Sequence, residues 1–115
     1  ELYQSYGEWI NNMNKCIKDY VIAGSLLQGI GKFIEYSIDS DGKPCRSEKG
    51  KLFRYPWLGA YIAMENGLPK EVVHIIVSTS DKYSPGKGKV FKSPESILVK
   101  NVELICLCII YNLYA

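Results

Sequence analysis

Apolar residues recur at three- and four-residue steps along much of this 115-residue chain. Such spacing places them on one face of a helix, whereas a half-buried strand alternates at every second residue. The pattern predicts helices within residues 7–30, 56–64, 69–77 and 94–110, with a short buried strand as the alternative for the apolar run 21–27. The sequence therefore predicts an all-α fold.

Proline, glycine and serine mark where these helices begin and end. Pro56 suits the first turn of a helix, and Gly67 follows that helix where a left-handed terminating residue is expected. Pro69 then begins the next helix at once. Ser93 offers a capping hydroxyl directly before Pro94, which favours a helix start at that point. The small residues of the run 23–25 permit close contact between helices.

Two polar segments, residues 38–51 and 83–89, lack periodicity and are rich in turn-forming residues, so they are predicted to be long loops. The first loop and the residues after it carry a basic run interrupted only by Glu48. The ordinary interpretation of such a run is a set of charges exposed to solvent. The more specific interpretation is electrostatic attraction to a nucleotide or an acidic partner. The basic residues are Lys43, Arg46, Lys49, Lys51 and Arg54.

Composition limits the class of protein. Hydrophobic residues make up 47% of the chain, enough for one modest core, so residues 1–115 are expected to form a single domain. The net charge of +2 is too small to indicate a protein that binds nucleic acid or a membrane surface. No signal-like start is visible, and the four cysteines lack C-x-x-C spacing. We therefore expect a cytoplasmic protein with a small-molecule or protein partner, and neither nucleic acid nor membrane.

The last predicted helix is apolar around most of its circumference. Leu98, Val102, Ile105 and Ile109 recur at helical spacing, and further isoleucines and leucines widen the apolar surface. Such a helix needs cover on several sides. Either it lies centrally, or it packs against a second copy of the protein or a missing domain. We therefore expect a homo-oligomer formed through the C-terminal helix.

Residues 23–33, AGSLLQGIGKF, resemble the signature of the HD-domain superfamily of metal-dependent phosphohydrolases. In that family a small apolar run leads into Leu-His-Asp-Ile-Gly-Lys, and here Gln28 and Gly29 stand in place of His-Asp. The resemblance implies a compact HD-like helical bundle of about five helices with two long loops.

Three later segments continue the resemblance, which covers residues 20–105. Residues 54–56, RYP, resemble the family's Arg-His-Pro before a helix, and residues 67–69, GLP, resemble its Gly-Leu-Pro helix start. Residues 77–80, VSTS, stand where members commonly have Ala-Thr-His-Ser. Residues 93–103 stand where they have Pro-Glu-Ala and then His-His-Ala-Asp.

The resemblance also locates the metal-ligand positions, and nearly all of them are substituted. In active members the His and Asp side chains hold one or two divalent metals that lower the pKa of a bound water. The corresponding positions here are Gln28, Gly29, Tyr55, Thr79 and Glu103, of which only Glu103 keeps a carboxylate. Loss at four or five positions leaves too little charge and donor capacity for a metal.

The family's first histidine normally lies on an earlier helix, and residues 1–22 contain no histidine, which leaves open that an upstream helix is missing. We therefore expect no metal, no cofactor and no catalytic residue. The function expected is that of a catalytically inactive HD-like protein acting in binding, regulation or self-assembly.

The alternative is a phosphohydrolase or phosphodiesterase that uses Mn or Mg in an altered site. Glu103, Gln28 and Thr79 would build that site, with the single histidine, His74, as the outside candidate for a general base. His74 lies between apolar neighbours, so a packed histidine hydrogen-bonded to a backbone group is the competing interpretation.

Lys32, Arg54 and Tyr55 are the candidate ligand-binding residues, for a nucleotide or another phosphate-containing small molecule. Lys32 follows the lost His-Asp pair and could bind an anion near a helix terminus, or simply close a helix end as a solvated cation. The aromatic residues Tyr55, Trp57 and Tyr61 could line a former active-site cavity, or be buried in a helical core.

Overall fold

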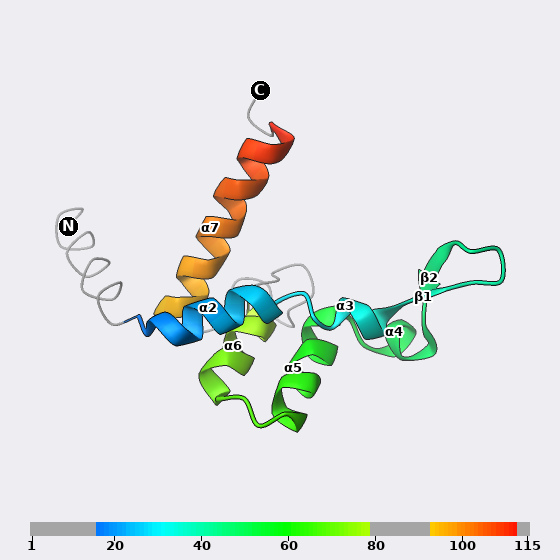
Figure 1. Ribbon diagram of the computed structural model, residues 1–115, viewed down its shortest axis with the longest axis horizontal. Helices are drawn as coiled ribbons and strands as arrows, with labels where there is room; N and C mark the ends of the chain where they lie inside the picture. Colours follow the sequence, from blue (N-terminus) through cyan, green and yellow to red (C-terminus); the bar gives the residue numbers. More distant parts are fainter. Residues whose placement is uncertain (1–15, 79–92, 113–115) are drawn as a thin grey trace.

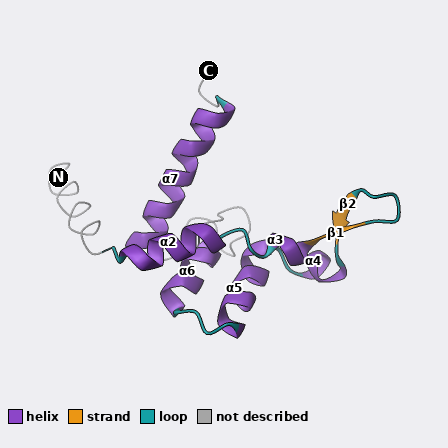
Figure 2. Cartoon of the chain, viewed as in Figure 1, coloured by secondary structure: helices purple, strands orange, loops and turns teal. Residues whose placement is uncertain are grey.

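The computed structural model describes residues 16–78 and 93–112, and these are mainly helical, which confirms the predicted all-α class (Figure 1 and Figure 2). The helices are α2 (Lys18–Leu27), α3 (Lys32–Glu35), α4 (Glu48–Leu52), α5 (Tyr55–Glu65), α6 (Lys70–Ser78) and α7 (Pro94–Tyr111). Two three-residue strands, β1 (Tyr36–Ile38) and β2 (Pro44–Arg46), complete the described elements.

Helix α6 lies at the centre and packs against α2, α5 and α7. It buries Val72, Ile75 and Ile76 completely or nearly so. Helix α2 approaches it closely at Gly24, where an added Cβ would lie 2.5 Å from Cγ2 of Ile75. The predicted role of the small residues in helix contact is therefore confirmed at Gly24, and the core forms around α6.

Local signals set the helix boundaries as the sequence predicts. Pro56 lies in the first turn of α5, and Gly67 after its end has a φ of +70°. The amide of Leu68 donates to the carbonyl of Ala63 (3.0 Å), so the last carbonyls of α5 are satisfied by a Schellman motif. The hydroxyl of Ser93 accepts from the amide of Ser96 (3.2 Å) and caps α7.

The predicted long loop at residues 38–51 is wrong. Strands β1 and β2 pair antiparallel, and α4 follows them. The turn between the strands is closed by Asp39, whose Oδ1 accepts from the amides of Asp41 (2.9 Å) and Lys43 (2.8 Å). Strands of three residues are too short to show an alternating pattern, so periodicity could not reveal them. The second predicted loop, residues 83–89, lies outside the described residues.

The first predicted helix, residues 7–30, is only partly helical in the described part of the chain, where α2 begins at Lys18. Residues 7–15 lie outside the described part of the chain, and α2 ends at Leu27. A turn at residues 28–31 follows, and within it the chain passes close to the start of α5. An added Cβ at Gly31 would clash there with the backbone oxygen of Tyr55.

Glu35, at the end of α3, joins the small elements to α5. Its side chain is fully buried, and its Oε1 forms an ion pair with Nε of Arg54 (2.5 Å). Its Oε2 accepts from the amide of Tyr55 (3.1 Å), and its backbone carbonyl accepts from the amide of Ser47 (2.9 Å). One residue thus fixes the positions of α3, the start of α4 and the start of α5.

Gly50 of α4 packs directly against the backbone of Glu35, and this contact can be tested. An added Cβ would overlap the Glu35 carbonyl oxygen, so Gly50→Ala must displace α4. We expect a loss of about 1–3 kcal/mol in the free energy of unfolding, measured by chemical denaturation.

Gly29→Ala is the matched control, because the nearest atom to its added Cβ is Cδ of Lys32 at 3.9 Å. That change should alter the free energy of unfolding by less than about 0.5 kcal/mol. Equal stability of the two variants would contradict the tight contact at Gly50.

Candidate functional site

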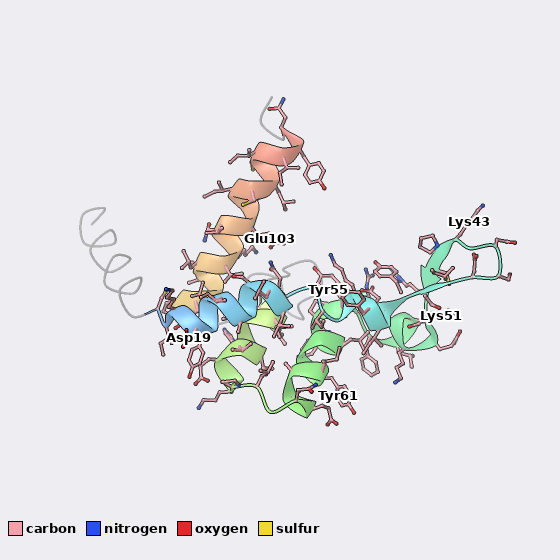
Figure 3. All side chains as sticks on the ribbon, in the orientation of Figure 1. Asp19, Lys43, Lys51, Tyr55, Tyr61 and Glu103 are labelled. Carbon is pink, nitrogen blue, oxygen red and sulfur yellow. The ribbon has the colours of Figure 1, made fainter. Side chains whose placement is uncertain are left out.

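The structure distributes the family-position residues over three separate elements. Gln28 and Gly29 lie half-buried in the turn after α2, and Tyr55 is the first residue of α5. Glu103 lies in the middle of α7, which packs against α2 and α6 (Figure 3). Thr79 lies outside the described residues. Within residues 16–78 and 93–112, no three His, Cys, Asp or Glu side chains come together as a metal site would require.

Lys32 and Tyr55 do lie together. The ammonium of Lys32 stands over the Tyr55 ring, 4.9 Å from its centroid, a cation-π contact worth about 0.5–1 kcal/mol at an exposed site. Lys32 is the first residue of α3, and because this helix has only four residues Lys32 also lies in its last turn. The contact that the structure gives its ammonium is with the Tyr55 ring.

Arg54, the third candidate ligand-binding residue, already has an anionic partner. Its guanidinium pairs with the buried carboxylate of Glu35, and its side chain is only 26% exposed. The pair neutralises the charge that a phosphate group would otherwise attract. Tyr55 contacts Lys32 and follows Arg54 in the chain; Lys32 is exposed, whereas Arg54 and Tyr55 are half-buried.

His74 on α6 takes part in a packing contact. Its Nε2 accepts a hydrogen bond from the backbone amide of Ser93 (3.1 Å), directly before α7. The packed-histidine interpretation made from the sequence is confirmed. Because Nε2 is the acceptor, the proton of the neutral ring lies on Nδ1. The bond joins α6 to the base of α7.

Glu95 makes a second connection to the base of α7. This buried carboxylate accepts from the amide of Ile17 through Oε1 (3.0 Å), which ties the start of α2 to the first turn of α7. Partial burial, and then the nearby charge of Glu95, raise the pKa of the Cys16 thiol above its ordinary value. The thiol of Cys16 therefore remains protonated at neutral pH, and none of the four cysteines, all of which lie among the described residues, forms a disulfide bond.

Beyond this base, α7 leaves the rest of the protein. Its buried residues are Glu95, Ser96 and Val99, all in the first two turns. Further along, Ile105 is 58% exposed and Ile109 is 75% exposed. Figure 1 shows the second half of α7 extending away from the other described elements. None of the helices among the described residues combines the length and apolarity needed to cross a bilayer.

An apolar groove lies beside α5, and it is lined by Trp57 and Tyr61, two of the three aromatic residues that the sequence predicted either to line a cavity or to be buried in the core. It has a volume of about 800 Å³ and is bordered by residues of α3, α4 and α5. The lining residues are Ile34, Lys49, Leu52, Phe53, Arg54, Trp57, Leu58 and Tyr61. Trp57 and Tyr61 are four residues apart on α5, and this spacing was the sequence signal that they share a helix face. The position of α4 opposite them could not be predicted.

Comparison with models of known protein families, with curated proteins and with solved structures finds no match to this chain. The relationship to the HD-domain superfamily therefore stays a prediction from the quoted motifs. The features of the structure that bear on function are its helical fold and two exposed apolar surfaces, one on α7 and the other in the groove.

Proposed function

We propose that this chain is a catalytically inactive, HD-like helical domain that functions by assembling with a second copy of itself through α7. The observation that supports the proposal is the exposure of apolar side chains along the outer half of this helix. Contiguous exposed apolar surface commonly marks a site of protein association. The exposed apolar residues of α7 are Ile97, Val102, Leu104, Ile105, Leu107, Ile109, Ile110 and Tyr111.

The base of α7 is held firmly, so the exposed part is presented in a fixed direction. Ser93 caps the helix, Glu95 binds the amide of Ile17, and Val99 is buried. His74 adds a bond to the residue before the helix. A surface already ordered in the free protein loses less conformational entropy when it binds.

The residue spacing of α7 suits a second helix of the same kind. Leu98, Val102, Ile105 and Ile109 are separated by four, three and four residues, which is the spacing of a coiled-coil seam. Two copies of α7 related by a two-fold axis would place this seam against itself, with β-branched side chains at three of its four positions. A short seam of this kind gives an association that depends on protein concentration.

The chemistry of the family positions supports the inactive part of the proposal. Gln28 offers a neutral amide, Gly29 offers no side chain, and the ring of Tyr55 contacts Lys32. Glu103 stands on α7, which packs against α2 and α6. A neutral amide and a phenol are poor substitutes for the imidazole and carboxylate ligands of a divalent metal.

Assembly through α7 is tested by light scattering over a range of protein concentrations. The wild-type mass should rise from 13.0 kDa toward twice that value as concentration increases. In the double variant Ile105→Glu and Ile109→Glu it should stay at the monomer value, because each buried isoleucine contributes about 1.5–3 kcal/mol.

The matched control is Leu26→Glu on α2, since Leu26 is 77% exposed and lies outside α7. This variant should associate as the wild type does. A wild type that is monomeric at every concentration, or a control that dissociates as fully as the α7 variant, would refute assembly through this helix.

Catalytic inactivity is tested separately by metal content and hydrolysis. After incubation with Mn or Mg and removal of free ion, we expect substoichiometric metal and no hydrolysis of bis(p-nitrophenyl) phosphate above the rate in metal-containing buffer. Glu103→Gln should change neither value. Stoichiometric metal together with turnover that Glu103→Gln abolishes would establish the phosphohydrolase alternative instead.

A further inference from the structure

The groove between α4 and α5 has a buried floor and an exposed rim. Leu58 on the floor is 7% exposed, whereas Leu52 and Trp57 on the rim are 78% and 42% exposed. Sites for small molecules usually bury most of the ligand's surface on several sides. A groove with such an exposed rim is better suited to a partner large enough to cover the rim residues, such as a helix.

The side chains of the groove are those that dominate protein interfaces. Phe53, Trp57 and Tyr61 are aromatic, and all three are exposed. Trp and Tyr are enriched among interface residues whose truncation costs most of the binding energy. Trp57 and Tyr61 are four residues apart on α5 and can accept apolar side chains that recur at the same spacing on a partner helix.

The elements that border the groove are held in place by bonds within the chain. The Glu35 carboxylate holds the start of α5 through Arg54 and the amide of Tyr55. On the other side, the hydroxyl of Ser47 accepts from the amide of Gly50 (2.9 Å) and donates to the carbonyl of Ile34 (2.5 Å). These bonds fix α4 and α5 relative to α3, which lowers the entropy lost on binding.

The charge at the groove is positive. Lys49 and Arg54 are its charged lining residues, and among the described residues no acidic side chain lines it. Arg54 is neutralised by Glu35, and Glu48 pairs with Lys51 (2.6 Å). Lys49 has no ion-pair partner within the described part of the chain, so its exposed ammonium is the uncompensated charge at the rim.

The surrounding sequence has the same sign, since residues 43–54 contain five basic residues and one acidic residue. An apolar face flanked by carboxylates would therefore complement the groove. We propose that this groove binds an amphipathic helix of another protein, one that presents apolar anchors three to four residues apart and carries acidic residues beside them. The proposal concerns a different surface from α7 and does not depend on self-assembly.

The test uses two designed helical peptides with the same apolar face, one flanked by Glu and the other by Lys, each carrying a fluorophore. Binding to the full chain is followed by fluorescence anisotropy. We expect the Glu peptide to bind about tenfold more tightly than the Lys peptide. Trp57→Ala should weaken binding of the Glu peptide about tenfold or more.

Lys49→Glu should also weaken binding of the Glu peptide and reduce the difference in affinity between the two peptides. Lys49 is exposed, so this variant serves if Trp57→Ala does not fold. Lys70→Glu, an equal change of charge at an exposed site on α6, is the control and should leave the preference for the Glu peptide intact. Equal binding of both peptides, or equal effects of Lys49→Glu and Lys70→Glu, would overturn the proposal.

A second readout places the peptide at the groove. The chain has two tryptophans, so Trp9→Phe leaves Trp57 as the only one, and its emission should shift to shorter wavelength when the Glu peptide binds. Peptide binding should persist in the variant with Ile105→Glu and Ile109→Glu, whatever its state of assembly. Competition by a peptide of residues 94–111 at least as strong as the Glu peptide would overturn the proposal, because the occupant would then be α7 of a second copy.

Discussion

The buried carboxylate of Glu35 is the contact on which one half of the protein depends. Placing a charge out of water costs several kcal/mol, and this cost is offset only because Arg54 and the amide of Tyr55 both bind the carboxylate. The backbone of the same residue binds Ser47 and leaves room only for glycine at position 50. The hairpin, α4 and the start of α5 therefore have one common anchor, and the groove between α4 and α5 results from it.

The other half is organised around α6. Gly24 lets α2 approach Ile75, and His74 and Glu95 fasten the base of α7 to α6 and to the start of α2. Both polar contacts lie at the base, so they orient α7 without covering its outer turns. The result is a rigid support that presents an apolar helix, and this arrangement is the physical basis for proposing assembly through α7.

The boundaries of α5 and α7, unlike those of α2, could be predicted because their causes are local. Pro56, Gly67 and Ser93 each act through the backbone within one turn of their own position. The hairpin and the Glu35 pair could not be predicted, because their partners are distant in sequence and a single acidic residue gives no sign that it is buried. The sequence indicated that Trp57 and Tyr61 could line a cavity, but the groove itself could not be predicted, because it requires α4 and α5 to be placed together first.

The candidate site was predicted only in part. The motif comparison grouped Tyr55 with Glu103, and the structure places them on α5 and α7, while it brings Lys32 onto the ring of Tyr55. The sequence therefore identified the chemistry of these side chains, but it did not predict how they are arranged in space. The structure adds two exposed apolar surfaces with different properties, an uncharged seam on α7 and a positively charged groove beside α5.

Assembly through α7 is tested most directly by amide hydrogen exchange of residues 102–111 at two protein concentrations about a hundredfold apart. An uncovered helix end opens readily, whereas a helix packed against a second copy does not. Exchange of these amides should slow at the higher concentration while that of α5 stays unchanged. Equal exchange of residues 102–111 at both concentrations would contradict the proposed assembly.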